Sequence, residues 1–300
     1  HTGGWNVLLT PFLFKGGHTY LLDRFDPEQI LRLCDEVGMT ILWGVPTMLR
    51  MLADHPRFEQ TSFRTVRYAI VGGEAMPEPL IRRWHQKGVP IRQGFGMTEV
   101  GVNCFSLPED DALRKIGSIG FPNFYVEARI VDETGREVGV DEVGELLMRG
   151  PVVTPGYWQR PEATAEAIDA EGWFHTGDLV RRDAEGYFYV VGRKKDMYIS
   201  GGENVYPAEI EAVLRAHPDV ADAAVVGVPD PKWGETGAAF VVPKPGRTLT
   251  AEAVQRYCRS QLAGYKVPRH VFFLEALPLG PTGKCDKQAL RERARNLISR

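Results

Sequence analysis

The stretch Gln93-Gly94-Phe95-Gly96-Met97-Thr98-Glu99 directly follows a short apolar run, 89–91, that predicts a buried strand. Two glycines around an aromatic residue leave bare backbone against which a planar ring can lie. Thr98 offers a hydroxyl to a phosphate, and Glu99 offers a hard oxygen to Mg²⁺. The same residues also fit an ordinary strand-to-loop turn with glycines at positive φ, so this stretch alone leaves both interpretations open.

Upstream of this stretch, helix and strand signals alternate along the chain. The patterns predict helices over 26–37, 47–52 and 77–87 and buried strands over 40–45 and 66–71. A second glycine-rich stretch, Val71-Gly72-Gly73-Glu74, stands at a strand's end, where ligands bind in open α/β sheets. Glycine pairs also make tight turns, so its signal alone is weak. The alternation favours an α/β fold with a partly parallel sheet covered by helices.

Glycine and proline recur every few residues from about residue 117, which predicts a small antiparallel or barrel-like subdomain over about 117–192. Its expected strands lie at 126–131, 144–148 and 187–191. Further along, helices are predicted over 207–217, 250–262 and 286–298, and strands over 220–228, 237–243 and near 270–275. The charged run Arg193-Lys194-Lys195-Asp196 marks the join. We therefore expect one domain over 1–192, a hinge over 193–196 and an α+β domain over 197–300.

Two later stretches carry chemically useful side chains. In Trp173-Phe174-His175-Thr176-Gly177-Asp178-Leu179, a carboxylate held by a Thr-Gly turn can accept both hydroxyls of a ribose, although an aspartate there also fits the closing of its own turn. In Pro278-Leu279-Gly280-Pro281-Thr282-Gly283-Lys284, a lysine on a stiffened loop suits a phosphate or a developing negative charge. Taken alone, that lysine also fits a solvated surface. The loop lacks the glycine spacing and the following Ser/Thr of a P-loop.

Composition narrows the class of protein. The 300 residues include 36 basic and 39 acidic side chains, a net charge of −3, which provides no electrostatic footprint for nucleic acid or anionic lipid. The four cysteines are scattered without a C-x-x-C pair, as suits a reducing compartment. The densest apolar run, 7–14, is interrupted and too short to span a membrane. We expect a cytoplasmic enzyme with no transmembrane segment, and leave peripheral membrane attachment open.

Taken together and in this order, the stretches resemble the adenylate-forming superfamily of acyl-CoA synthetases, peptide adenylation domains and luciferases. Between and after them, 144–150 with 156–158, 192–196 with 200–204, and 207–211 resemble further motifs of that superfamily. The resemblance runs over essentially the whole chain. It implies an α/β fold with a partial large N-terminal domain and a small, mobile C-terminal domain. The superfamily's Ser/Thr/Gly-rich phosphate-binding loop lies upstream of His1, so we interpret the sequence as a C-terminal fragment with weak or no activity of its own.

Within the superfamily, Gly96–Glu99 and Trp173–Asp178 resemble CoA ligases. His1-Thr2-Gly3-Gly4-Trp5-Asn6 is similar to fatty acyl-CoA synthetases, in which a tryptophan gates the acyl tunnel, although Trp5 also fits a core aromatic. The resemblance thus implies an ATP-dependent ligase joining a fatty acid to CoA through an acyl-adenylate. An aryl-acid or carrier-protein-loading ligase, or an inactive nucleotide-binding chain, remain alternatives. A homodimer is left open.

The resemblance also implies roles for individual residues. Lys284, Thr98 and Glu99 would be catalytic, with Glu99 holding Mg²⁺ and Lys284 bridging carboxylate and α-phosphate. The acyl pocket or its gate would include His1, Trp5 and Trp43, the pantetheine tunnel Gly201 and Gly202, and Lys195 would be the pivot. The ATP or AMP site would comprise Gly72, Gly73, Glu74, Gln93, Gly94, Phe95, Gly96, Met97, Thr98, Asp178, Arg193 and Lys284.

Overall fold

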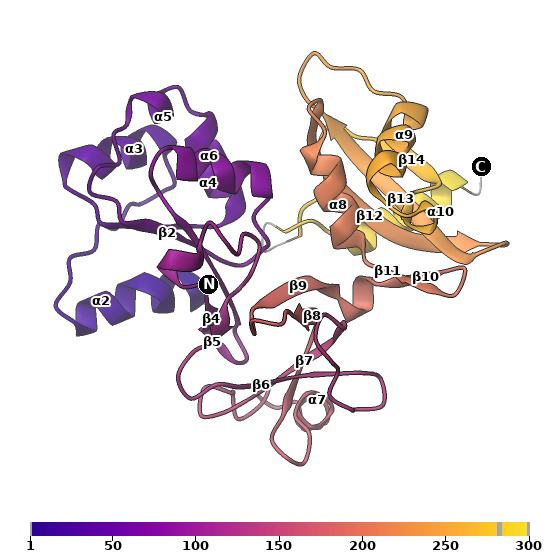
Figure 1. The fold of residues 1–300 in the computed structure, drawn as a ribbon, viewed down its shortest axis with the longest axis horizontal. Coiled ribbons are helices and arrows are strands. Elements are labelled where there is room, and N and C mark those ends of the chain that lie inside the picture. The colour runs from indigo at the N-terminus through magenta and orange to yellow at the C-terminus, as the bar shows by residue number, and fades with distance from the viewer. Residues whose placement is uncertain (1, 281–283, 299–300) are drawn as a thin grey trace. The chain divides into compact units, whose positions relative to one another are not determined.

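The computed structural model describes residues 2–280 and 284–298, which form two compact units (Figure 1). The first unit comprises His1–Thr176 and Val180–Val190, and the second comprises Gly177–Leu179 and Val191–Arg300. The predicted hinge at 193–196 therefore lies just inside the second unit, and its role as a hinge stays a prediction. Within the described ranges, no helix has the length and apolar character needed to cross a membrane.

A five-stranded sheet with the order β1-β2-β3-β4-β5 organises the first unit. Its strands are β1 (Ile41–Gly44), β2 (Tyr68–Val71), β3 (Ile91–Met97), β4 (Gly101–Ser106) and β5 (Phe121–Pro122). The sheet is parallel from β1 to β3 and antiparallel from β3 to β5. The expected partly parallel α/β sheet is confirmed, but the sequence patterns did not predict β4.

Helices cover this sheet because their apolar residues recur at helical spacing. They are α3 (Pro27–Glu36), α4 (Pro46–Asp54), α5 (Arg57–Gln60) and α6 (Glu78–Gln86). Asp26 caps α3 by accepting a hydrogen bond from the Gln29 amide at 3.0 Å. Trp84 of α6 is fully buried, packs edge-on against Phe58, and donates from Nε1 to the Leu49 carbonyl oxygen. Three helices are thereby joined around one indole ring.

The remaining elements of the first unit lie at its two sequence ends. Before α3, the chain forms α1 (Thr2–Gly4), a π-helical turn η1 (Trp5–Leu9) and α2 (Thr10–Phe14). After β5, strands β6 (Glu127–Val131), β7 (Gly144–Arg149), β8 (Phe174–Arg182) and β9 (Phe188–Arg193) form a sheet in that order. This sheet is open, so the barrel-like expectation for 117–192 was too specific. The short helices η2 (Glu109–Asp111) and α7 (Pro161–Ala167) lie in the connections.

The alternative interpretation of residues 93–99 as a strand-to-loop turn is wrong, because β3 continues to Met97. The glycines of this stretch do not have positive φ values. They are needed because β4 runs close alongside: a Cβ atom on Gly96 would lie 2.5 Å from the Gly101 carbonyl oxygen. Close backbone approach, and not turn geometry, explains the glycine there.

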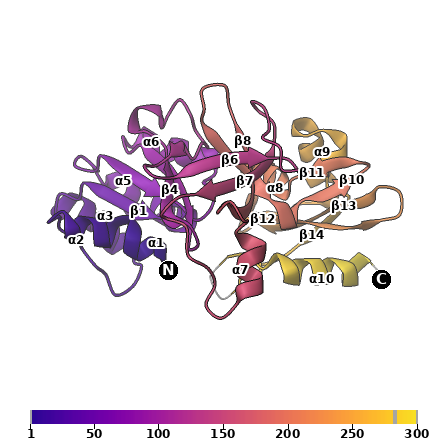
Figure 2. The same ribbon diagram turned by 90° about the horizontal axis from the view of Figure 1, so that it is seen from below.

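The second unit is an α+β layer structure around the long hairpin β12 (Val220–Asp230) and β13 (Gly234–Pro243). Its sheet has the order β11-β10-β13-β12, and β14 pairs parallel with β13. The remaining elements are η3 (Lys194–Asp196), β10 (Tyr198–Ser200), β11 (Glu203–Val205), α8 (Pro207–Ala216), α9 (Ala251–Gln261), η4 (Gly264–Lys266), β14 (His270–Phe273) and α10 (Lys287–Ile298). Apolar residues of α8 and α9 pack on one face of the hairpin, and those of α10 on the other (Figure 2).

A cross-strand glycine pair makes room for one buried ring in this unit. Gly227 of β12 pairs with Gly237 of β13, and Tyr198 lies over both. A Cβ atom would lie 2.5 Å from the Tyr198 Cβ if built on Gly227, and 2.6 Å from the Tyr198 hydroxyl if built on Gly237. Tyr198 is 2% exposed, and no partner for its hydroxyl is found among the described residues. The ring therefore contributes packing at the cost of a buried, unsatisfied hydroxyl.

We predict that Gly237→Ala destabilises the protein by about 1–3 kcal/mol, because the added methyl group overpacks against the Tyr198 hydroxyl. Adding Tyr198→Phe should recover part of that loss, since it removes the atom that the methyl group meets. Urea unfolding followed by circular dichroism measures both effects. Gly264→Ala is the matched control, because no atom lies within 4 Å of its added methyl group. Equal losses for Gly237→Ala and Gly264→Ala would contradict the packing explanation.

Candidate nucleotide-binding and catalytic site

The first unit brings the two glycine-rich stretches together where β2 ends beside the middle of β3. Val71 is in register with Gln93, and a Cβ atom on Gly72 would lie 3.9 Å from the Gly94 carbonyl oxygen. Gly73 is exposed and has φ +88°, a conformation that glycine adopts without strain. Glu74 is also exposed. Bare backbone from both stretches therefore lies at the sheet edge where open α/β folds bind ligands.

Gln93 supports this edge with its side chain. The side chain is buried, accepts a hydrogen bond from the Met76 amide at 3.1 Å, and donates from Nε2 to the Gly117 carbonyl oxygen at 3.4 Å. Both contacts are to backbone groups, so the amide holds the loop that follows Gly72 and Gly73 in place. A direct contact between Gln93 and a nucleotide stays a prediction.

Phe95 and Met97 alternate with Gly94 and Gly96 along β3, as strand geometry requires. Phe95 packs edge-on against Phe105 with ring centroids 5.8 Å apart, and both Phe95 and Met97 lie against the apolar cluster of β4, β7 and β8. The aromatic residue of the motif is therefore half-buried and anchored. The faces of Gly94 and Gly96 point the other way and carry no side chain.

Glu99 lies in the turn after β3, where its carboxylate is within reach of a neighbouring loop. The Tyr157 hydroxyl donates to Glu99 Oε1 at 3.2 Å, and the Thr154 amide donates to the Glu99 carbonyl oxygen at 2.7 Å. Burial, followed by the negative charge of Glu99, raises the pKa of Tyr157, so Tyr157 remains a donor at neutral pH. Thr98 beside it is exposed.

Tyr157 is a site residue that the sequence analysis did not assign. Its signal was present, because Gly156-Tyr157-Trp158 belongs to a stretch that resembles a superfamily motif. That motif had no chemical role until the fold placed Tyr157 at Glu99. Among the described residues no group of three or more metal-ligating side chains occurs. Mg²⁺ bound at Glu99 would therefore complete its shell with phosphate oxygens and water, as is usual for this ion.

The second unit contains the other group of predicted nucleotide residues. Arg193 Nε lies 2.8 Å from Asp178 Oδ1, and the Asp178 side chain is 4% exposed. Burial raises the pKa of Asp178 to about 6, against the opposing positive charges of Arg193, Lys284 and Lys195. The carboxylate is thus ionised at neutral pH and close to its titration point. Gly177 has φ +68°, so the strand is locally twisted at this residue.

Lys284 is exposed on a loop that backbone hydrogen bonds close on both sides. The Gly280 amide donates to the Lys284 carbonyl oxygen, and the Asp286 amide donates to the Pro278 carbonyl oxygen, both at 2.8 Å. Asp286 then caps α10 by accepting from the Ala289 amide at 3.0 Å. These hydrogen bonds join the two ends of the loop next to Lys284. The positive charge of Lys284 opposes the rise in the pKa of Asp178. Pro281, Thr282 and Gly283 lie outside the described residues.

The predicted pantetheine glycines form the turn between β10 and β11. Gly201 and Gly202 have φ values of +63° and +89°. The Gly201 amide donates to the Trp233 carbonyl oxygen at 2.9 Å, and a Cβ atom on Gly201 would lie 2.8 Å from the Trp233 ring. Both backbone conformation and the indole require glycine at this position. A tunnel at these residues stays a prediction.

Of the predicted acyl-pocket residues, His1 lies outside the described part of the chain. Trp5 is 62% exposed, so its alternative interpretation as a core aromatic was wrong. Trp43 of β1 is half-buried, and its Cζ2 atom lies 3.6 Å from a Cβ atom built on Gly3. The Gly3 backbone of α1 therefore lies beside the indole ring of Trp43.

We predict that Asp178→Asn stabilises the protein at pH 7.5 by up to about 3 kcal/mol, because a neutral amide avoids the burial of a charge whose pKa is about 6. The unfolded carboxyl loses its proton near pH 4, so the folded state binds more protons between about pH 4 and 6 and the advantage should disappear in acid. Urea unfolding at pH 7.5 and 4.5 measures the difference.

The control for this experiment is Asp141→Asn, which removes an exposed carboxylate paired with Arg181 at 2.5 Å. That variant should change stability by less than about 1 kcal/mol at either pH. Asp178→Asn should also weaken AMP binding, which calorimetry on the same variant measures. A stability difference that does not depend on pH would contradict the burial argument.

Comparison with known proteins shows which family the chain resembles. Residues 1–158 match the family described as AMP-binding enzyme, and residues 209–284 match the AMP-binding enzyme C-terminal domain. A feruloyl-CoA synthase from Amycolatopsis sp is 42% identical over 293 residues, which are 98% of this chain and 60% of that protein. An indoleacetate–CoA ligase from Aromatoleum aromaticum is 41% identical over 97% of this chain and 57% of its own length. The chain thus spans about three fifths of these relatives.

Solved structures share the fold. The crystal structure of ATP-bound MatB from Rhodopseudomonas palustris has a TM-score of 0.92 and 37% sequence identity, covering 99% of this chain and 59% of that chain. The adenylate-forming fold expected from the motifs is therefore confirmed. The matched ranges include the glycine edge of β2 and β3, Glu99 with Tyr157, and Lys284. From the order of its motifs, its fold and these matches, the chain belongs to the AMP-binding enzyme family.

Proposed function

We propose that the protein to which this chain belongs is an ATP-dependent acid–CoA ligase acting on an aromatic carboxylic acid. The observation that carries this proposal is the similarity, over nearly the whole chain, to relatives whose names specify feruloyl-CoA and indoleacetate as product or substrate. Both acids are aryl acids. They support the aryl-acid alternative over the fatty acid that the His1–Asn6 stretch suggested.

Aromatic surfaces in the first unit agree with this choice. Trp43 is half-buried beside Gly3 of α1, and Trp5 of the next turn is exposed. Flat indole faces that are not filled by the protein's own core suit an aryl ring, which gains both buried area and ring–ring contact. A flexible alkyl chain gains only the area. We assign these two tryptophans to the acid pocket.

In the first half-reaction, a carboxylate oxygen of the acid attacks the α-phosphorus of ATP. An oxygen–phosphorus bond forms, the bond to the β-phosphate oxygen breaks, and pyrophosphate leaves. Two negatively charged groups meet, so positive charge must be supplied where they approach. Lys284 supplies it between carboxylate and α-phosphate, and Thr98 orients the α-phosphate with its hydroxyl. Mg²⁺ held by Glu99 offsets phosphate charge when it is bound.

Each unit is assigned its own part of the nucleotide. The backbone of Gly72, Gly73 and Gly94 receives the adenine ring, with Gln93 supporting the loop from below. Asp178, kept ionised by Arg193, accepts the ribose hydroxyls. The exposed Lys284 loop is close enough to Asp178 for their charges to interact. Adenine is thereby assigned to the glycine backbone, the ribose to Asp178 and the α-phosphate to Lys284.

In the second half-reaction, the sulfur of CoA attacks the acyl carbonyl carbon and gives up its proton to solvent. A carbon–sulfur bond forms, the bond between the acyl carbon and the phosphate oxygen breaks, and AMP leaves. The thiol must occupy space that Lys284 held during adenylate formation. We propose that the part of the second unit that follows Lys195 rotates about this residue, withdrawing Lys284 and bringing the Gly201–Gly202 turn toward the thiol. A single rotation then alternates between two mutually exclusive sites.

A panel of carboxylic acids tests the substrate class. Full-length enzyme should release pyrophosphate with ferulate, indoleacetate or benzoate at a kcat/KM at least about tenfold above that for octanoate or palmitate, because only aryl rings stack on the indoles. Thioester should form only when CoA is present. Preference for the alkyl acids would refute the aryl assignment, and acyl transfer to a carrier protein in place of CoA would favour the carrier-loading alternative.

Replacing the proposed catalytic amine tests the mechanism. Lys284→Ala should lower the rate of adenylate formation by about 10²–10³-fold, because an electrostatic contact made in the transition state is lost. Because Lys284 is also assigned to the α-phosphate, AMP binding, measured by calorimetry, should weaken too, but only by about tenfold or less, since an exposed charge contributes little to ground-state binding. Lys244→Ala, which removes an exposed lysine of the same unit, is the charge-matched control for adenylate formation. Wild-type pyrophosphate release by Lys284→Ala would show that Lys284 does not have this role.

A further inference from the structure

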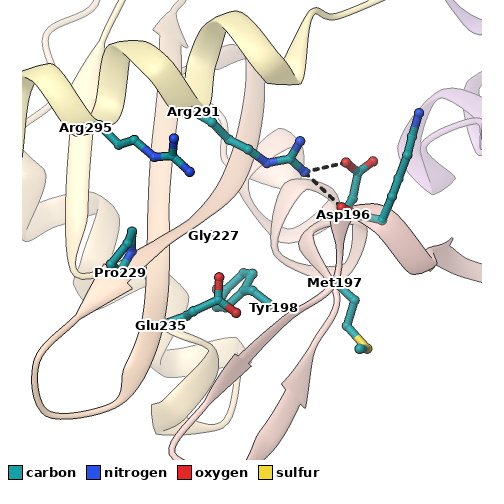
Figure 3. Close-up of a pocket in the computed structure, with 9 residues that line it drawn as sticks. Asp196, Met197, Tyr198, Gly227, Pro229, Glu235, Arg291 and Arg295 are labelled. Carbon is teal, nitrogen blue, oxygen red and sulfur yellow. Dashed lines mark hydrogen bonds and ion pairs between the residues drawn. The ribbon is translucent and has the colours of Figure 1, made fainter.

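The proposed pivot is flanked by two ion pairs within the second unit. Upstream, Arg193 pairs with the buried carboxylate of Asp178 at 2.8 Å. Downstream, Arg291 of α10 donates to Asp196 Oδ1 at 2.6 Å and to the Lys195 carbonyl oxygen at 3.3 Å (Figure 3). These contacts lie on either side of Lys195 in the sequence. The shorter one is charge-assisted, which is the stronger class of hydrogen bond.

Arg291 reaches the pivot from a firmly anchored helix. Leu290 and Ala294 on either side of it are fully buried against β12 and β13. One turn earlier, Lys287 Nζ lies 2.7 Å from the buried Glu211 carboxylate, which also accepts a hydrogen bond from the Val225 amide. Arg291 itself lines a hollow of about 320 Å³ together with Tyr198, Glu235 and Arg295. The backbone of Arg291 is therefore fixed by the packing of α10, and its guanidinium reaches the loop from that fixed position.

The same helix carries the catalytic loop. The loop that ends at Lys284 closes on itself through Asp286, and Asp286 caps the first turn of α10. Arg291 therefore ties the peptide that follows Lys195 to the element that carries Lys284. A rotation at the φ and ψ angles of Lys195 preserves both Arg291 contacts, because the peptide between Lys195 and Asp196 moves with the helix. A rotation at Asp196 would break them.

Resistance to rotation at Lys195 itself is small. A backbone hydrogen bond from the Met197 amide to the Arg193 carbonyl oxygen, 3.1 Å long, spans the pivot residue. Lys195 is exposed, so water can replace such a neutral bond when it opens. The charge-assisted contact to Asp196 is partly buried and harder to replace. The backbone bond across Lys195 thus opens more easily than the Arg291–Asp196 contact, which favours rotation at Lys195.

We propose that Arg291 is a positioning residue that locks the peptide between Lys195 and Asp196 to α10, so that rotation occurs at Lys195 and moves the Lys284 loop by the full angle. This inference rests on the proposed two-step function. It also makes Asp196, which the sequence analysis placed only within the hinge run, the specific partner that holds the downstream side of the pivot.

A double-mutant cycle in the full-length enzyme tests this role. Lys195→Pro should slow thioester formation from preformed acyl-adenylate by about 100-fold, because proline stiffens the pivot. In the Arg291→Ala background the same substitution should cost only about tenfold, since the freed Asp196 provides a second place to rotate. A purely structural role for Arg291 would leave the Lys195→Pro penalty unchanged.

Arg293→Ala is the matched control, because Arg293 lies on the same helix, carries the same charge and is exposed. It should leave the 100-fold penalty of Lys195→Pro intact to within about threefold. Asp196→Asn keeps the size of the side chain and removes its charge, so it should reduce the penalty as Arg291→Ala does. It decides the question if Arg291→Ala fails to fold.

The outcomes separate the two proposals. Equal Lys195→Pro penalties in the presence and absence of the Arg291–Asp196 pair overturn the inference about Arg291. Absence of adenylate and thioester formation in the unmodified full-length enzyme, with every acid of the panel, instead overturns the proposed function. A reduced penalty with Arg291→Ala and Asp196→Asn, but not with Arg293→Ala, supports the positioning role.

Discussion

Burial of the Asp178 carboxylate against Arg193 is the interaction on which the proposed site depends. A carboxyl group with so little exposure tends to take up a proton, and nearby positive charges keep it ionised at neutral pH. Those charges belong to Arg193, Lys195 and Lys284, which are also the proposed ribose ligand, pivot and catalytic residue. The residue that would hold the ribose is therefore electrostatically coupled to the residues that would move. The charges that would act on the bound ribose thus include those of the pivot and of the catalytic lysine.

The two units use different means to hold their functional groups. In the first unit, the contacts come from neutral donors and acceptors: the Gln93 amide holds the loop after Gly73 through backbone groups, and the Tyr157 hydroxyl donates to the Glu99 carboxylate. In the second unit, charged pairs dominate, and Asp196 with Arg291 continues the series that begins at Asp178. Neutral hydrogen bonds suit a fixed platform that receives a planar ring. Charged pairs that are partly or fully buried are costly to break, which suits residues that must stay in place on either side of a pivot.

The sequence allowed much of the fold to be predicted, and the errors have physical causes. Helices such as α3 and α9 were predicted nearly to the residue, because their caps and apolar spacing are local properties. The extent of β3 was misjudged, because Gly94 and Gly96 resemble a turn when the approach of β4 is unknown. Trp5 was assigned equal weight as gate and core residue, and its exposure could not be deduced from its neighbours. The acid class was suggested by a six-residue similarity, whereas comparison over nearly the whole chain supports aryl acids.

The sequence by itself determined the family, the order of the elements and the identity of the residues that can carry charge to a nucleotide. Those properties follow from local composition and spacing, which do not depend on how distant segments meet. The tertiary structure alone decided that Tyr157 contacts Glu99, that Gln93 supports and does not simply line the loop, and that Arg291 contacts Asp196. Each of these pairs is separated by many residues along the chain. Their contact results from sheet pairing and helix packing, and no short stretch of sequence contains that information.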